Sequence, residues 1–252
     1  MTSLGAPDLT GRRVLVTGGT RGIGAAIVDA AEAAGAVVLV HGTRAADAAA
    51  HRAAAKRTGA RREYLHADFG DATALEAFCD DVRAREVDVL INNAGVNRIQ
   101  TIDQLSAEDY EWLMAIDLRA PLLLSQAAAH GMRERGWGRI VNVASIWSVI
   151  TKPGRALYTA AKAGLAGLTR TLAVELAPHG VLVNALSPGF TRTELTASTL
   201  APEEIAALSA QVPARRFAEP AEIAQVALFL ASPANTYLTG QNIIVDGGFT
   251  CV

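Results

Sequence analysis

A tyrosine and a lysine four residues apart are the first feature of this chain that suggests catalysis. Tyr158 and Lys162 stand in the run Tyr-Thr-Ala-Ala-Lys, and residues at i and i+4 lie on the same side of a helix. A free phenol ionises only near about pH 10, whereas a nearby ammonium favours the phenolate, so Tyr158 could exchange a proton with a carbonyl or alcohol oxygen. Ser145 follows an apolar run and could hydrogen-bond the same oxygen. Taken alone, such a pair is more typical of an exposed helix, and such a serine of a turn or cap.

A glycine-rich turn separates the first strand-like run from the first helical stretch. Glycine permits positive φ and close approach of a ligand, and a helix start supplies free N–H groups that suit a pyrophosphate. The spacing here is Gly-x-x-x-Gly-x-Gly, and in a strand–turn–helix context it predicts a dinucleotide site, with a tight turn without ligand as the alternative. The residues expected to contact the cofactor are Gly18, Thr20, Arg21, Gly22, Ile23 and Gly24.

The end of the second strand-like run bears on the choice of cofactor. NAD-binding proteins commonly place an acidic residue there, but the run from Val40 to Arg44 has none. Arg44 and Arg21 would suit a 2′-phosphate, so we expect NADP(H), with NAD(H) as the alternative. Asp68, with Phe69 after the third strand, is expected near the adenine, although an aspartate close to Asp71 is also a typical helix cap.

These residues fall between short β-branched runs that alternate with Ala-rich stretches. Strands are expected over 13–17, 37–40, 63–66, 87–91, 139–143, 181–184 and 243–245, and helices over 22–34, 45–58, 71–85, 106–135, 155–177 and 220–231. The alternation predicts parallel pairing, and the nearly continuous apolar strands predict a sheet that is covered on both faces. The predicted fold is one α/β domain over 1–252, a doubly wound parallel sheet (Rossmann fold) of about seven strands, with a tail over 1–11.

Composition excludes several classes of protein. The 252 residues are 50% hydrophobic and 19% charged, which excludes a disordered chain. The net charge of −2 lacks the basic footprint of a nucleic-acid binder, and the two cysteines and five histidines show no metal-ligand spacing. No signal peptide and no apolar run of about 18 residues is found. We therefore expect a cytoplasmic protein without nucleic-acid, membrane or metal partners.

Further motifs occur along the chain in a characteristic order. They are Asn92-Asn-Ala-Gly95, Pro188-Gly189, Gly240-Gln241 and Asp246-Gly-Gly248. Together with the glycine-rich turn, the serine and the Tyr-x-x-x-Lys pair, they cover about residues 12–250. The chain resembles the short-chain dehydrogenase/reductase family, of the compact type that includes β-ketoacyl carrier-protein reductases and sugar or alcohol dehydrogenases.

The resemblance implies hydride transfer between NADP(H) and a carbonyl or secondary alcohol. Tyr158 would be the acid–base residue, Ser145 would orient the substrate oxygen, and Lys162 would bind the nicotinamide ribose and assist Tyr158. Asn92 would brace the sheet behind the cofactor. The other positions implied to contact the cofactor are Asn93, Ala94, Gly95, Pro188, Gly189, Thr191 and Thr193.

One position departs from the family pattern. Asp117 stands where the family usually has an asparagine whose backbone helps to hold a proton-relaying water. A carboxylate near Lys162 would partly neutralise the field of the ammonium. We therefore include Asp117 among the catalytic candidates and expect an alkaline pH optimum or slow reduction at neutral pH. The alternative is that Asp117 points elsewhere and changes nothing.

Residues 190–215 interrupt the alternation and, by the same resemblance, form a lid over the substrate. The residues implied to line the pocket are Asn97, Trp147, Arg155 and Phe190. Trp147 suggests an apolar or ring-bearing substrate. Arg155 and Arg98 could meet a carboxylate or phosphate, although each is also typical of an exposed surface.

Two other functions stay open. One is an NAD(H)-dependent alcohol dehydrogenase of the same family, and the other is a catalytically weak cofactor-binding protein, since a fold alone does not imply a function. The resemblance also implies a homotetramer that is built through the two long helices and the C-terminal strand region. Their alanines and leucines would equally suit packing on the chain's own sheet.

Overall fold

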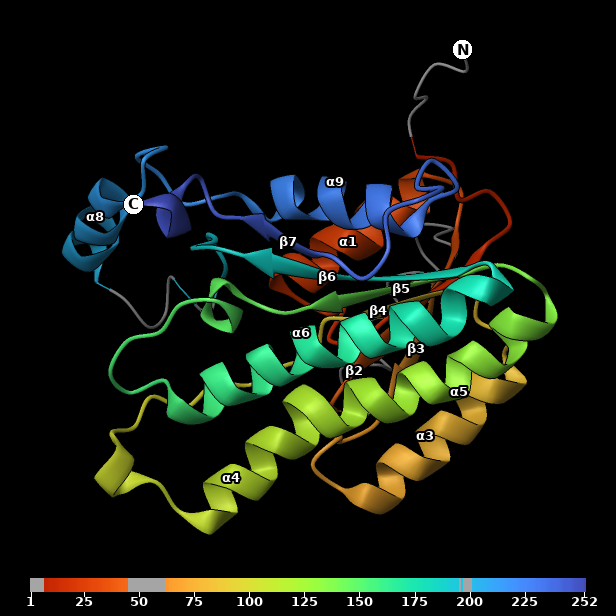
Figure 1. Cartoon of the computed structure of the whole chain (residues 1–252), viewed down its shortest axis with the longest axis horizontal. Helices are drawn as coiled ribbons and strands as arrows, with labels where there is room; N and C mark the ends of the chain where they lie inside the picture. Colours follow the sequence, from red (N-terminus) through yellow and green to blue (C-terminus); the bar gives the residue numbers. More distant parts are fainter. Residues whose placement is uncertain (1–6, 45–61, 195, 197–200) are drawn as a thin grey trace.

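The computed structural model describes residues 7–44, 62–194, 196 and 201–252, and its centre is one sheet of seven parallel strands (Figure 1). The order across the sheet is β3-β2-β1-β4-β5-β6-β7. The strands are β1 (Arg13–Val16), β2 (Val37–Gly42), β3 (Arg62–His66), β4 (Val89–Asn92), β5 (Gly138–Val143), β6 (Val181–Pro188) and β7 (Asn242–Val245).

Helices cover both faces of the sheet. In Figure 1, α1 and α9 lie above it, whereas α3, α5 and α6 lie below it. The helices are α1 (Gly22–Ala33), α3 (Ala72–Ala84), α4 (Ala107–Met114), α5 (Ala120–Glu134), α6 (Ala156–Leu176), α8 (Pro202–Gln211) and α9 (Pro220–Ala231). The predicted doubly wound α/β fold with a parallel sheet is therefore confirmed.

Apolar side chains on both faces of the strands hold these layers together. Val14 and Val16 of β1 face α1 and α9, where they pack with Ile27 and Ala227. Leu15 of the same strand faces the other layer, with side chains from α3, α5 and α6. Because the central strands β4, β5 and β6 bury both of their faces, nearly all of their residues are apolar, which explains these runs in the sequence.

The helix predicted over 106–135 is interrupted in the structure. Between α4 and α5 lies a π-helical segment, Ala115–Arg119, in which the N–H of Ala120 donates to the carbonyl of Ala115. Pro121 has no N–H and cannot form the α-helical hydrogen bond to the carbonyl of Asp117, so an ordinary helical turn is unavailable there. The wider turn buries Asp117 completely. The helix predicted over 45–58 lies outside the described residues.

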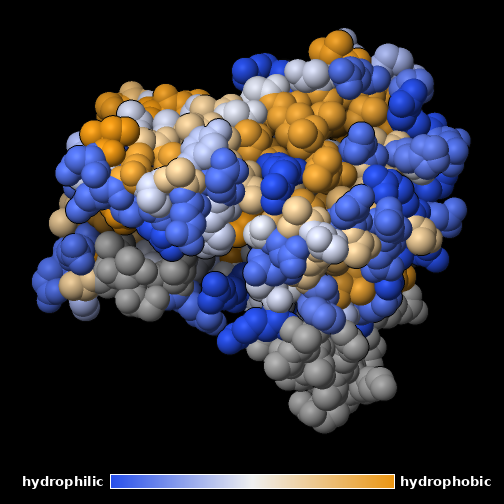
Figure 2. Space-filling view, turned by 90° about the horizontal axis from the view of Figure 1, so that it is seen from below, coloured by the Kyte–Doolittle hydropathy of each residue, from blue (hydrophilic) through white to orange (hydrophobic). Residues whose placement is uncertain are grey.

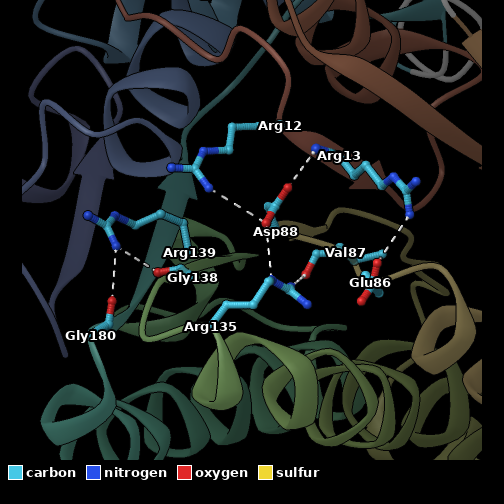
Figure 3. Close-up of polar contacts among 9 residues, drawn as sticks. All are labelled: Arg12, Arg13, Glu86, Val87, Asp88, Arg135, Gly138, Arg139 and Gly180. Carbon is cyan, nitrogen blue, oxygen red and sulfur yellow. Dashed lines mark hydrogen bonds and ion pairs between the residues drawn. The ribbon is translucent and has the colours of Figure 1, made fainter.

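The amino edge of the sheet is held by a network of charged side chains (Figure 3). Asp88 accepts a hydrogen bond from the backbone N–H of Arg13 at 3.0 Å and forms ion pairs with Arg12 and Arg135. The buried Arg139 donates to the carbonyls of Gly138, Gly180 and Asn235, and burial lowers the pKa of its guanidinium to about 10. These contacts join the starts of several strands, at the edge opposite the candidate catalytic residues.

Candidate active site

The candidate site begins where β1 and β4 end side by side and the chain leaves them for opposite halves of the sheet. In open α/β sheets, ligands bind at such a switch point. The buried Thr17 accepts hydrogen bonds at its Oγ1 from the backbone N–H groups of Asn93 and Ala94, both at 2.9 Å. The Asn93 amide donates in return to the carbonyls of Thr17 and Gly18. The two loops above these strands are thereby fixed to each other.

The glycine-rich turn forms a cradle with no room for side chains at its crowded positions. Gly18 has a φ of +61°, and a Cβ there would lie 2.9 Å from Cα of Ala94. A Cβ at Gly24 would lie 2.2 Å from the carbonyl oxygen of Gly18, and one at Gly22 would lie 3.3 Å from Thr193. The first turn of α1 carries no acidic residue, and no side chain caps its N-terminus. The turn therefore fits a dinucleotide phosphate.

The side chains expected at the adenosine end have different roles. Arg44 is exposed just beyond β2, and Asp68 is exposed beyond β3. Asp71, not Asp68, caps α3, since its Oδ1 accepts from the backbone N–H groups of Thr73 and Ala74. The Phe69 ring is buried and stacks on His41 at 4.1 Å between centroids, so only its backbone faces the site.

Lys162 and Asp117 form a buried ion pair. The Lys162 ammonium lies 3.2 Å from Oδ2 of Asp117 and donates to the carbonyl of Val143 at 3.2 Å. The other oxygen of Asp117, Oδ1, accepts from the backbone N–H of Val96 at 2.7 Å. Burial alone would lower the pKa of Lys162, but Asp117 and Tyr158 raise it above its ordinary value. Burial raises the pKa of Asp117 even though Lys162 opposes this.

Tyr158 and Ser145 complete the cluster. The Lys162 ammonium lies 5.5 Å from the centroid of the half-buried Tyr158 ring, one helical turn away on α6. Ser145, at the end of β5, is 8% exposed and accepts at its Oγ from the backbone N–H of Trp147 at 3.3 Å. The short helix Ile146–Ser148 that follows packs against α6. A phenol, an ammonium and a hydroxyl therefore lie at the carboxyl edge of the sheet.

The residues expected in the substrate pocket differ in their exposure and in their contacts. Asn97 is exposed, and Trp147 is buried beneath the guanidinium of Arg155. Phe190 stacks on Phe217, with centroids 5.2 Å apart, and meets the edge of Phe249. Phe190 thus fixes the base of the 190–215 segment to the C-terminal residues, and part of that segment lies outside the described residues.

Comparison with known proteins shows the family to which the chain belongs. A family described as Enoyl-(Acyl carrier protein) reductase matches residues 18–250. The chain is 37% identical over 243 residues to a 3-oxoacyl-[acyl-carrier-protein] reductase from Aquifex aeolicus (strain VF5), with 95% of this chain and 98% of the relative covered. It is 36% identical over 251 residues to a gluconate 5-dehydrogenase from Gluconobacter oxydans (strain 621H), with 96% of each covered. The chain belongs to the short-chain dehydrogenase/reductase family.

A solved structure in this family supports the same assignment. A gluconate 5-dehydrogenase from Burkholderia cenocepacia J2315, in complex with NADP and tartrate, matches with a TM-score of 0.92 and 32% identity over 99% of each chain. Members of the family are NAD(P)-dependent oxidoreductases, and this chain is one of them.

Three side chains that sequence reasoning left out of the list of candidates also shape the site. Thr17 fixes the glycine-rich turn to the loop after β4. His41 accepts at Nδ1 from the N–H of Gly18, and its Nε2 lies 3.0 Å from the carbonyl of Ala67. Burial lowers the pKa of His41 to about 4, so the ring is neutral. It links the backbone of Gly18 to that of Ala67. Asn142 receives a hydrogen bond from Asn92 at 2.8 Å, which braces the centre of the sheet. All three are polar residues that lie within an apolar strand run or directly after one, and this pattern is the sequence signal by which they could have been predicted.

The last strands of the sheet close the site. Pro188 ends β6, and the N–H of Gly189 donates to the carbonyl of Val245. The buried Thr191 donates to the carbonyl of Gly189. Thr193 lies against Gly22, which brings the segment after β6 to the glycine-rich turn.

In the part of the chain that the structure describes, we find no group of three or more His, Cys, Asp or Glu side chains able to hold a metal ion. None of the helices in that part is long and apolar enough to cross a bilayer.

Proposed function

We propose that this chain transfers a hydride between NADP(H) and a carbonyl or secondary alcohol, with Tyr158 as the acid–base residue. The observation that carries the proposal is that Lys162 lies beside the Tyr158 ring and donates to the carbonyl of Val143, two residues before Ser145, at the edge where the glycine cradle lies. Within the family, such an arrangement suits oxidoreduction rather than cofactor storage.

The residues that would hold the cofactor surround the switch point. The cradle and the uncapped start of α1 would bind the pyrophosphate. Lys162 would contact the nicotinamide ribose, and Pro188, Gly189 and Thr193 would contact the nicotinamide. When bound, NADP(H) supplies the hydride at its nicotinamide ring, and the protein supplies position and charge.

The proton would be handled by Tyr158. In reduction, its hydroxyl would donate to the carbonyl oxygen, while Ser145 would hydrogen-bond the same oxygen and fix its direction. Lys162 is charged because Asp117 opposes the effect of burial, and its ammonium favours the phenolate that is left after donation. Asp117 acts through Lys162 and is a positioning residue.

The choice of NADP(H) rests on charge at the end of β2. Arg44 is exposed there, and Arg21 is exposed at the start of α1. Acidic residues that would hold an unphosphorylated ribose are absent from the described stretch 37–44. The Burkholderia cenocepacia relative was solved with NADP, which supports the same choice.

The test is a pair of measurements on the purified protein. Titration with NADPH and with NADH should give the tighter binding to NADPH. NADPH should then be oxidised by at least one member of a panel of ketones, sugar acids and acyl thioesters. Tighter binding of NADH would overturn the cofactor choice, and binding of NADPH without turnover of any compound would favour a cofactor-binding protein instead.

A further inference from the structure

Two cations flank the buried indole of Trp147 beside the candidate catalytic residues. The Lys152 ammonium and the Arg155 guanidinium each lie 5.5 Å from the centroid of its ring. Neither cation forms an ion pair with any acidic residue among those described. A contact with an aromatic face stabilises a cation but offers it no hydrogen-bond acceptor.

Arg155 is half-buried, and one of its donors is not satisfied inside the protein. Its Nε is buried and has no hydrogen-bond partner in the described structure. Burial lowers the pKa of the guanidinium, and Tyr158 only partly offsets this. A buried donor without a partner is costly, and such atoms in native structures call for an explanation, of which a missing ligand is one.

Unlike Arg155, Arg98 has an acidic partner inside the protein. Its guanidinium pairs with Asp109, whose side chain is 7% exposed, and also lies over the Trp112 ring. The charge of Arg98 is therefore already matched inside the protein. The sequence offered two arginines as contacts for a carboxylate or phosphate of the substrate. Arg98 already has an acidic partner inside the protein, so Arg155 is the one of the two that can bind an external anion.

Arg155 also lies close to the reacting groups. It directly precedes α6, and its carbonyl accepts from the N–H of Thr159 at 2.7 Å, so it belongs to the same helical turn as Tyr158. Side chains three residues apart on a helix are neighbours. Trp147 in turn donates its backbone N–H to Ser145. An anion on Arg155 would therefore lie within a few atoms of the oxygen that Tyr158 protonates.

We propose that Arg155, assisted by Lys152, binds a carboxylate of the substrate, so that the chain reduces oxo acids and oxidises the corresponding hydroxy acids. This inference rests on the proposed function and names the substrate class for that site. The planar guanidinium suits a carboxylate because it can form two parallel hydrogen bonds with it. The reaction balances as oxo acid, NADPH and a proton giving hydroxy acid and NADP⁺.

An acyl group on a carrier protein fits these observations less well. Its reacting 3-oxo group is a ketone whose neighbour is a neutral thioester in place of a carboxylate, and the charges of the carrier lie at a distance from that ketone. It would leave Arg155, one helical turn from Tyr158, without a counter-charge. Preference for an acyl thioester is therefore an outcome that would overturn the inference.

The test compares substrates that differ in charge. NADPH oxidation by the full chain is measured with 5-oxogluconate against the neutral ketose fructose, with acetoacetate against ethyl acetoacetate, and with an acetoacetyl thioester. We expect kcat/KM to be higher for the acid than for the neutral compound in at least one pair. Higher values for both neutral compounds or for the thioester overturn the inference while leaving the proposed function in place. No oxidation by any compound, with NADPH still bound, overturns both.

Variants of Arg155 test whether this residue causes the preference for acidic substrates. Arg155→Gln should lower the acid-to-neutral ratio of kcat/KM by about 10- to 100-fold, mainly through KM, because a hydrogen bond to a charged group is lost. Arg155→Lys should restore part of the ratio. Arg170→Gln is the matched control, since Arg170 is exposed farther along α6, and it should leave the ratio as in the unaltered chain. An unchanged ratio in Arg155→Gln overturns the assignment to Arg155.

Discussion

The carboxylate of Asp117 lies 3.2 Å from the ammonium of Lys162, and both side chains are almost completely buried. The resemblance implies an asparagine at this position, where this chain carries the aspartate that forms the ion pair. The pair joins the π-helical turn between α4 and α5 to the helix that carries Tyr158. Under the proposed function, this ion pair sets the charge beside the oxygen with which Tyr158 exchanges its proton.

Asp117→Asn should move the pH–rate profile for alcohol oxidation to lower pH by about one unit, which corresponds to about 1.4 kcal/mol. Without the carboxylate, the positive charge of Lys162 beside Tyr158 is no longer partly cancelled. The pKa of Lys162 also falls, because burial is then opposed only by Tyr158, so the falling limb shifts in the same direction. A profile that coincides with that of the unaltered chain would contradict this role.

The same pair should contribute to stability in a pH-dependent way. The folded pKa of Lys162 is raised, so its stabilisation is fully present below the ordinary lysine value and is lost as the pH rises through the raised value. Thermal melts of the unaltered chain and Asp117→Asn, compared at neutral and strongly alkaline pH, should therefore converge at the alkaline end.

Gly24→Ala should destabilise the fold by about 2–4 kcal/mol and prevent NADPH binding, because its Cβ would lie 2.2 Å from the carbonyl oxygen of Gly18. Gly167→Ala on α6 is the matched control, since its Cβ would meet only an arginine terminus at 3.7 Å. That control should be neutral or stabilising by up to about 1 kcal/mol. Denaturant unfolding and NADPH titration measure both effects, and equal behaviour of the two variants would refute the cradle.

Arg44→Ala should weaken NADPH binding by about 10- to 100-fold and leave NADH binding nearly unchanged, because the lost contact is with the 2′-phosphate. Arg170→Ala again serves as the control. If both cofactors lose affinity equally, Arg44 has no selective role.

The predicted homotetramer can be tested on the helices that lie below the sheet in Figure 1, and Figure 2, seen from that side, shows hydrophobic residues gathered on parts of this face. Among the exposed large hydrophobic side chains are Tyr110 of α4, Leu122 of α5 and Val174 of α6, with Val174 exposed by 77%. Sedimentation should give four times the 26.3 kDa chain mass, and Leu122→Asp with Val174→Asp should give smaller species that keep their circular dichroism. A monomeric unaltered chain would end this prediction.

Much of the fold could be predicted because most of the strands are short and apolar and are bounded by glycine or polar residues. The strands predicted at Arg13–Thr17 and 139–143 differ from β1 and β5 by one residue. Strand β6 runs to Pro188, four residues beyond the prediction, because Ala185–Pro188 pair with β7, a contact that no local pattern reveals. The π-helical turn was likewise missed, although Pro121 was its signal.

The sequence predicts which residue types form the site, but it does not predict which side chains they pair with. The sequence could name Arg98 and Arg155 as possible anion contacts, but only the fold places Asp109 against Arg98 and leaves Arg155 without a carboxylate. The sequence also left open whether Asp117 faces Lys162, because the π-helical turn that directs it inward depends on tertiary packing. Long-range pairing decides which polar residues are matched inside the protein.

The most direct test of the central claim is Tyr158→Phe, which removes one oxygen and keeps the ring. The variant is compared with the unaltered chain for NADPH oxidation by the best substrate of the panel and for NADPH affinity. We expect the rate to fall by about 100- to 10,000-fold while the Kd for NADPH changes by less than about threefold. A variant that binds NADPH normally and retains most of its rate would show that Tyr158 is not the proton donor.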